Sequence, residues 1–177
     1  MLRIFLISVF LIFSNLAFGK YLSFLDPKSE FIISKYLGKK FLIGNANYSF
    51  LFWNIYDAEL YSTSKKYNPN ELAIILKYNR SIDKETLSRE TINDIKEQKS
   101  ISNQQEEKWK SLLERIYIDT KTNKKFIAIK INNKSIFYYN NKKLHESFDE
   151  EFNQLFFDIW LRSNSKNPDF TRTLLGQ

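Results

Sequence analysis

Few residues in this 177-residue chain have the type and spacing that metal binding or acid–base catalysis requires. His145 is the only histidine and cysteine is absent, so the chain lacks the set of ligands that a typical transition-metal site uses. Asp57 and Glu59 stand two residues apart, which places them on one face of a strand. Because Tyr56 and Ala58 alternate with them, we expect both acids on a solvent face. We therefore assign no catalytic residue and no metal ligand.

The sequence motifs of the common enzyme classes are also missing. The chain contains no Gly-x-Ser-x-Gly turn, no Gly-x-Gly-x-x-Gly sequence and no phosphate-binding loop. Hydrolase, kinase and dinucleotide-dependent activities thus have no support in the sequence, and we expect no cofactor.

Alternating apolar residues and turn residues predict the strands. The stretch 48–53 is apolar at both alternating sets of positions, which is typical of a strand buried on both faces. Asn132-Asn133 tolerates positive φ and predicts a hairpin turn. The predicted strands cover residues 41–45, 48–53, 55–61, 72–78, 125–131 and 135–139.

Helix-capping residues predict four helices. The first covers 84 to about 99, the second has Trp109 on a single apolar face, and the third begins near Phe148 after a capping box formed by Ser147 and Glu150. The fourth is short and begins at Pro168, with Gly176 suited to the left-handed position past its end. The four predicted N-caps are Asp83, Ser102, Ser147 and Asn167. Residues 20–37 form a lead-in with a short amphipathic stretch.

This order of elements predicts an α+β fold with a largely antiparallel sheet and helices packed on one face. Residues 1–19 have one arginine, an apolar core and small residues at Ala17 and Gly19, which is typical of a secretory signal peptide cut after Gly19. We expect residues 20–177 to form a single domain in the periplasm or outside the cell, without a stable membrane anchor after cleavage.

The charge of the chain gives little information about partners. Lys and Arg number 27 against 20 Asp and Glu, a formal charge of +7. The lysine pairs are spread over turns and strand edges, where lysine discourages pairing between sheets. A nucleic-acid site requires basic residues gathered on one face, so we expect no nucleic-acid partner. The oligomeric state stays open.

Several blocks of the sequence resemble bacterial chalcone isomerase-like proteins. The strand Ile55 to Tyr61 is similar to one that runs through the chalcone isomerase superfamily. The resemblance covers roughly residues 41–176, and its other blocks are Leu76-Lys77-Tyr78, Asp83 to Leu87, Phe137 to Asn140, Phe156 to Leu161 and Leu174-Leu175-Gly176.

The resemblance implies a pocket and also a departure from the family pattern. In plant chalcone isomerases an arginine on a Gly-rich strand and a hydroxyl on the next strand organise the cyclisation of a chalcone, and in the related fatty-acid binders the arginine and a tyrosine hold a carboxylate. Tyr56 matches the hydroxyl position. Gly44 to Tyr48 occupies the place of the Gly-rich strand and contains no cation. Since a guanidinium supplies charge and bidentate geometry for an oxyanion, phenolate cyclisation is not expected.

The resemblance leaves three functions open. The first is a non-catalytic exported protein that binds a small apolar or amphipathic molecule such as a fatty acid. The second is an isomerase or intramolecular lyase acting on an unsaturated carbonyl compound, with Tyr56 as proton donor and Arg80 as anion holder. The third is a partner-binding module of the cell envelope. The candidate ligand-binding residues are Tyr48, Trp53, Tyr56 and Arg80.

Overall fold

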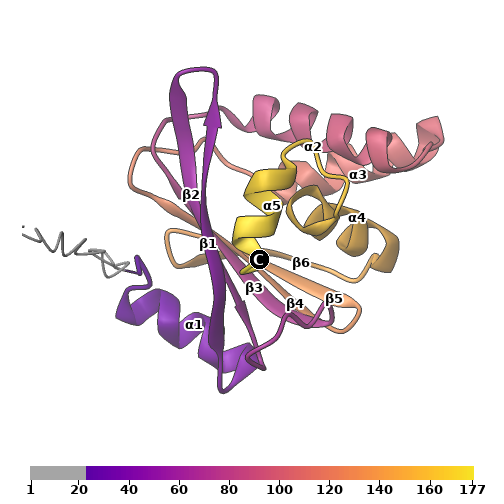
Figure 1. Cartoon of the computed structure of the whole chain (residues 1–177). Helices are drawn as coiled ribbons and strands as arrows, with labels where there is room; N and C mark the ends of the chain where they lie inside the picture. Colours follow the sequence, from indigo (N-terminus) through magenta and orange to yellow (C-terminus); the bar gives the residue numbers. More distant parts are fainter. Residues whose placement is uncertain (1–22) are drawn as a thin grey trace, which may run out of the picture.

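The computed structural model describes residues 23–177, so the expected signal peptide at 1–19 lies outside the described residues. Six strands form an antiparallel sheet in which each strand pairs with the next one in the sequence (Figure 1). The strands are β1 (Phe41–Phe50), β2 (Trp53–Ser62), β3 (Glu71–Tyr78), β4 (Lys125–Ile131), β5 (Lys134–Tyr139) and β6 (Lys142–Ser147).

Helices cover this sheet unequally. Four of them, α2 to α5, pack on one face, as the sequence predicted, and α1 covers part of the opposite face (Figure 1). The α+β fold class is thus confirmed, with α1 as an additional element. None of the helices described between residues 23 and 177 is long and apolar enough to cross a bilayer. The helices are α1 (Pro27–Leu37), α2 (Lys84–Gln98), α3 (Asn103–Ile116), α4 (Glu150–Leu161) and α5 (Pro168–Leu174).

Strand β3 explains why both faces of the sheet are covered. Leu72, Ile74 and Leu76 point into the main core beneath α2 to α5. Ala73 and Ile75 alternate with them and contribute to a second apolar cluster under α1. A strand that is apolar on both faces, as β3 is from Leu72 to Leu76, must be buried on both sides, and α1 supplies the second cover.

The first hairpin differs from its prediction. Residues 41–45 and 48–53 were expected as separate strands, but a single strand β1 runs to Phe50 and turns at Leu51 and Phe52 into β2. The expectation that 48–53 is buried on both faces is wrong for its last residues, since Phe52 is 98% exposed. The turn stands clear of the helices (Figure 1), so nothing in the described part of the chain covers it.

Two of the predicted helix starts are confirmed by their hydrogen bonds. The Asp83 carboxylate accepts from the amide of Thr86 at the start of α2. Ser102 and Gln105 form the reciprocal capping box at the start of α3. Both caps satisfy amides that would otherwise lack a partner at a helix N-terminus.

The predicted cap of α4 is wrong by two residues. Ser147 is the last residue of β6, and its hydroxyl accepts from the amide of Asp149. Asp149 is the true N-cap and accepts from the amide of Phe152. The Asp149 carboxylate also accepts from the indole of Trp109 at 3.0 Å. The strand continues further than the local capping pattern indicates, because β6 pairs with β5 up to Ser147.

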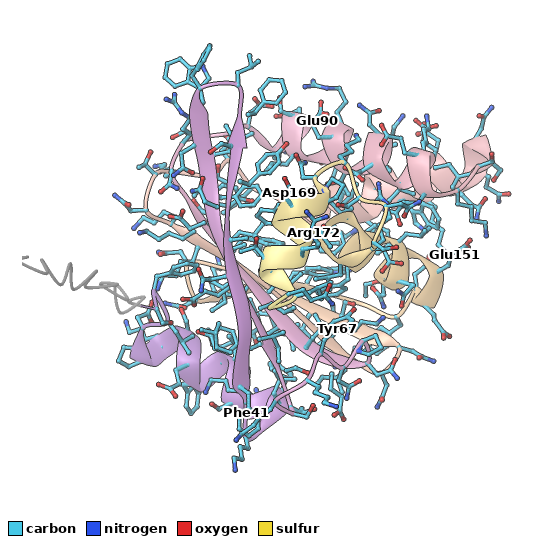
Figure 2. The ribbon with its side chains drawn as sticks, viewed as in Figure 1. Phe41, Tyr67, Glu90, Glu151, Asp169 and Arg172 are labelled. Atoms are coloured by element: carbon cyan, nitrogen blue, oxygen red, sulfur yellow. The ribbon has the colours of Figure 1, made fainter. Side chains whose placement is uncertain are left out.

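Helix α5 packs directly on the backbone of β1. A Cβ atom on Gly44 would lie 2.5 Å from the carbonyl oxygens of both Thr173 and Leu174, so only glycine permits this approach. Asp169 and Arg172 lie on the outer side of α5 (Figure 2). Asn167 precedes the helix without a side-chain cap bond, contrary to its predicted capping role, and Gly176 takes the expected positive φ of 72°.

Substitution of Gly44 tests this contact. We expect Gly44→Ala to lower the free energy of unfolding by about 3 kcal/mol, because the new methyl group meets backbone atoms that cannot rotate away. Gly38→Ala is the matched control, since its Cβ would meet nothing within 4 Å and its loss comes from the positive φ of 62° alone. Urea unfolding of the two variants measures the difference, and equal losses would contradict the assignment.

Candidate functional site

An aromatic recess lies between the first hairpin and α5. Tyr48 of β1 and Tyr56 of β2 are directly paired across the hairpin, with ring centroids 4.9 Å apart and nearly parallel planes. Phe170 of α5 stands edge-on to both rings at 5.9 and 6.1 Å. The recess has a volume of about 60 Å³, roughly that of two water molecules in the liquid. In this arrangement α5 closes it.

The hydroxyl group of Tyr56 is held at the inner end of the recess. It accepts a hydrogen bond of 2.9 Å from the indole nitrogen of Trp160 on α4. Burial raises the pKa of Tyr56 far above its usual value of 10, although the bond from Trp160 opposes the shift. The phenol therefore stays protonated at neutral pH, and its own proton is free to be donated toward a molecule in the recess.

A group of charged residues forms the rim. Lys166, in the loop before α5, lines the recess together with Asp94 of α2. The Lys166 ammonium lies 3.0 Å from the carboxylate of Glu97 and 3.5 Å from that of Asp94. Burial opposes its charge, but these two acids raise its pKa, so it remains a cation. Arg162 also contacts Asp94 at 2.9 Å, and both side chains are largely buried.

The position of Lys166 overturns the expectation that the recess has no cation. The stretch Gly44 to Tyr48 indeed carries no cation, but the structure brings an ammonium to the same recess from a loop more than a hundred residues later. The missing arginine therefore no longer argues against anion binding or turnover. No pattern in the sequence distinguishes this lysine, which stands in a polar loop, Ser163 to Asn167, from the many surface lysines.

The four predicted ligand-binding residues fall into two pairs. Tyr48 and Tyr56 line the recess. Trp53 lies at the start of β2 beside the turn, and the guanidinium of Arg80 stacks on its ring at 3.7 Å. Sequence reasoning missed Trp160, Phe170, Asp94 and Lys166 as neighbours of Tyr56. Trp160 lies on the helix predicted from Phe148, but that prediction does not reveal the direction of the indole N–H.

The expectation for Glu59 is wrong. Its carboxylate is fully buried on the α1 side of the sheet, where it accepts from the amide of Phe24 at 3.0 Å and from the hydroxyl of Tyr61 at 2.9 Å. Asp57 is half-buried on this side and accepts from the amides of Asn47 and Asn79. The strand pattern could not show this, because the segment before α1 supplies the cover. Both acids are held by hydrogen bonds and serve the structure.

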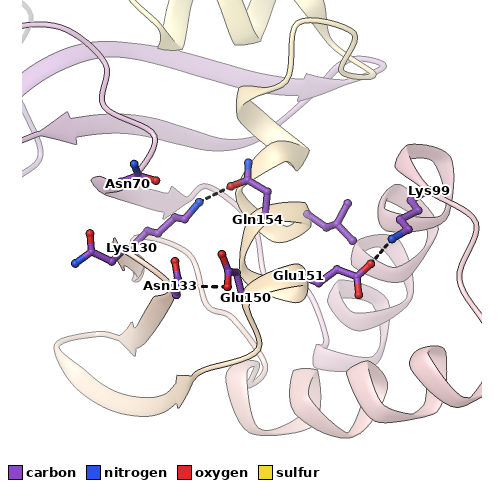
Figure 3. A pocket seen from close by; sticks show the side chains of 9 residues that line it. Asn70, Lys99, Lys130, Asn133, Glu150, Glu151 and Gln154 are labelled. Carbon is purple, nitrogen blue, oxygen red and sulfur yellow. Dashed lines mark hydrogen bonds and ion pairs between the residues drawn. The ribbon is translucent and has the colours of Figure 1, made fainter.

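A larger groove of about 530 Å³ lies beside α4 at the end of β4 (Figure 3). Its polar side chains already bind one another: Lys130 donates to Gln154, Asn133 to Glu150 and Lys99 to Glu151. Burial lowers the pKa of Lys130, against the opposing charges of Asp158 and Glu150. The polar groups of this groove are paired internally, and it lacks the stacked aromatic rings that line the recess at Tyr56.

His145 lies in β6 beside α3. It lines a shallow groove with Arg115, and burial together with that charge lowers the pKa of its imidazole. Among residues 23–177, no three His, Cys, Asp or Glu side chains gather in a way that could hold a metal ion.

Comparison with known proteins agrees with this geometry at the level of the fold. A fatty-acid binding protein from Arabidopsis thaliana superposes with a TM-score of 0.59, covering 77% of this chain and 87% of that one at 11% sequence identity. The fold is thus chalcone isomerase-like, as the sequence resemblance implied. A Haemophilus influenzae protein of uncharacterized function is 28% identical over 137 residues, 76% of this chain and 67% of that protein. No family model matches the sequence.

Alkaline unfolding tests the state of Tyr56. At pH 7 we expect Tyr56→Phe to cost about 1 kcal/mol, because the Trp160 indole loses its acceptor. The unfolded chain releases the phenol proton near pH 10, whereas the folded chain retains it. The wild type therefore loses stability as pH rises above 10. Tyr56→Phe should lose less free energy of unfolding over that range. Chemical unfolding at pH 7, 9.5 and 11 measures the difference.

Trp160→Phe is the matched control for this experiment. It removes the same hydrogen bond but keeps the buried phenol, so the wild-type loss of stability above pH 10 should persist. Identical pH dependence in the wild type and Tyr56→Phe would show that the phenol is not shielded as described.

Proposed function

We propose that this protein is a non-catalytic, exported member of the chalcone isomerase-like proteins that binds a small amphipathic molecule such as a fatty acid at the recess under α5. The observation that carries the proposal is the combination of an aromatic recess, formed by Tyr48, Tyr56 and Phe170, with an ammonium group at its rim, Lys166. An anionic head group would pair with Lys166 and an apolar chain would contact the rings. The fold shared with a fatty-acid binding protein supports this proposal.

Binding of a fatty acid requires the recess to enlarge. Sites for molecules of drug size have volumes of roughly 300–1,000 Å³, whereas the recess has about 60 Å³. The element that must move is α5, which has seven residues and no side-chain bond at its N-cap. Thr171 holds it through bonds to Ser165 and to the carbonyl of Trp160. Outward displacement of α5 would remove Phe170 from the tyrosines and leave their faces to the ligand.

The absence of an activated base within this site favours binding over turnover. Tyr56 is a neutral phenol that already accepts from Trp160. Asp94 is engaged by two cations, Arg162 at 2.9 Å and Lys166 at 3.5 Å, so its carboxylate is already occupied by ion pairs. The charged groups are thus arranged to hold an ion pair, which a ligand carboxylate can join.

Replacing the rim ammonium tests the proposed head-group contact. We expect Lys166→Gln to weaken binding of a fluorescent long-chain carboxylate by roughly tenfold, the value of a hydrogen bond to a charged group. The dissociation constant of the uncharged alcohol with the same chain should stay unchanged. Fluorescence titration of both probes measures the difference.

Lys99→Gln is the matched control, since Lys99 forms a comparable surface ion pair with Glu151 away from the recess. It should leave both dissociation constants unchanged. If the wild type binds neither probe, the proposed function is wrong. If Lys166→Gln weakens the carboxylate and the alcohol equally, the head group lies elsewhere.

An isomerase or intramolecular lyase is the second candidate, and one observation favours it. The Tyr56 hydroxyl and the Lys166 ammonium share the same recess, so a proton donor and a cation for a developing enolate are both present. Arg80, the expected anion holder, lies instead against Trp53. Consumption of an unsaturated ketone by the wild type, and its loss in Tyr56→Phe, would establish this activity in place of simple binding.

Export is the remaining part of the proposal and rests on the signal-like sequence at 1–19. Cell fractionation with mass measurement tests it: export and cleavage after Gly19 give an extracytoplasmic protein that begins at Lys20. A cytoplasmic protein of full length would contradict it.

A further inference from the structure

The turn of the first hairpin carries four consecutive large apolar residues, Phe50 to Trp53, which we call the hairpin tip. All four are exposed, with Leu51 at 75% and Phe52 at 98%. Single exposed apolar residues are common, but a contiguous group usually marks a contact surface. The tip stands clear of the rest of the molecule at one end of the sheet (Figure 1), so its side chains add nothing to the core.

The backbone of Leu51 gives independent support for a function of the tip. Five residues other than glycine have positive φ among the described residues, and the other four are asparagines: Asn123, Asn132, Asn140 and Asn141. Asparagine tolerates this conformation, whereas leucine does so at a cost. Leu51 has φ 54° at the very end of the hairpin. The chain thus keeps a strained apolar residue where a polar one would fold more easily.

The charges around the tip indicate what it contacts. The stack of Arg80 on Trp53 places a cation beside the apolar group. The nearest acid along β2, Asp57, is occupied by two asparagine amides. The chain as a whole has a formal charge of +7. This combination of apolar side chains, a flanking guanidinium and a net positive charge suits a surface with negative head groups over a hydrocarbon layer.

We propose that the hairpin tip inserts into the interface of a lipid bilayer that contains anionic lipids. A projecting turn needs no complementary pocket in a fluid bilayer, whereas a folded protein partner would have to supply one. Phe50, Leu51 and Phe52 enter the acyl boundary, and Trp53 lies at head-group level, where indole rings gather in membrane proteins. Arg80 reaches the phosphates from the same level. This contact is peripheral and is independent of any anchor at the start of the chain.

The position of the tip also bears on the proposed function. Tyr48 lies two residues before Phe50 on β1, and Tyr56 lies three residues after Trp53 on β2. The two tyrosines pair across the hairpin. Two residues of strand correspond to roughly 7 Å, so an amphipathic molecule leaving the bilayer at the tip is already near the recess. The membrane contact itself does not require that a ligand binds.

The variant Leu51→Asn separates membrane binding from folding. It should raise Tm by about 2 °C, because asparagine relieves the strain at positive φ. It should also weaken binding to vesicles of phosphatidylglycerol and phosphatidylcholine by roughly tenfold, since one fully inserted leucine is lost. A variant that folds better and binds less cannot be explained by misfolding. Co-sedimentation of the purified full protein with vesicles measures binding.

Two readouts locate the contact. Trp109 and Trp160 are buried, so a blue shift of tryptophan emission on adding vesicles reports Trp53. Phe148→Ser is the matched control, because Phe148 is 73% exposed at another place, beside Lys134, and should change binding by no more than about twofold. Vesicles of pure phosphatidylcholine should bind the protein more weakly. The difference between the two kinds of vesicle should become smaller as the salt concentration rises, because salt screens exposed charges.

Three results would overturn the proposal. If the wild-type protein binds neither kind of vesicle, the hairpin tip contacts something other than a bilayer. Vesicle binding unchanged in Leu51→Asn would place the contact elsewhere, with residues 1–19 the first candidate. Dimers of the wild type that disappear in Leu51→Asn would make a second copy of this chain the occupant. Each result leaves the binding test with Lys166→Gln unaffected, so failure here is distinct from failure of the proposed function.

Discussion

The close approach of the α5 backbone to β1 at Gly44 is the constraint on which the site depends. Because Gly44 has no side chain, the carbonyl groups of Thr173 and Leu174 lie against the strand. This fixes α5 at a distance at which Phe170, one turn earlier, reaches both Tyr48 and Tyr56. The loop before α5 is tied to the helix by the hydrogen bond between Ser165 and Thr171, and it brings Lys166 to the rim. The missing Cβ atom of Gly44 thus positions the rings, and the Ser165 bond positions the loop with the cation.

The sheet supports this site by being buried on both faces. Its two apolar clusters are separate, so the α2 to α5 side carries the recess, while the α1 side takes up the buried Glu59. Glu59 and Tyr61 tie the segment at Phe24 to β2 through hydrogen bonds. Buried carboxylates are expensive unless bonded, and here the bonds fix the lead-in of α1. The α1 side of the hairpin is thereby held by hydrogen bonds, while α5 packs on its recess side.

The sequence predicted most of the fold because its signals are local. Alternation in 72–78, the cap at Asp83 and the box at Ser102 each depend on neighbours in the chain, and each was confirmed. Three of the errors share one cause, which is a partner distant in sequence. The segment before α1 buries Glu59, pairing with β5 extends β6 through Ser147, and a late loop delivers Lys166. For the site, Tyr56 was recognisable by resemblance and Tyr48 as an aromatic residue of the neighbouring strand, whereas their charged neighbours have no pattern of their own.

One part of the first hairpin is paired with the rest of the sheet, and the part that carries the tip is not. Strand β2 pairs with β3 only from Tyr56 onward, so the residues from Ser49 to Asn54 form a two-stranded extension. Such ribbons are marginally stable in water when nothing else covers them. Here the stacked tyrosines and Phe170 hold the base of the ribbon, and the tip beyond it has apolar side chains that gain by leaving water. The same aromatic contacts that line the recess therefore also hold the base of the ribbon that carries the tip.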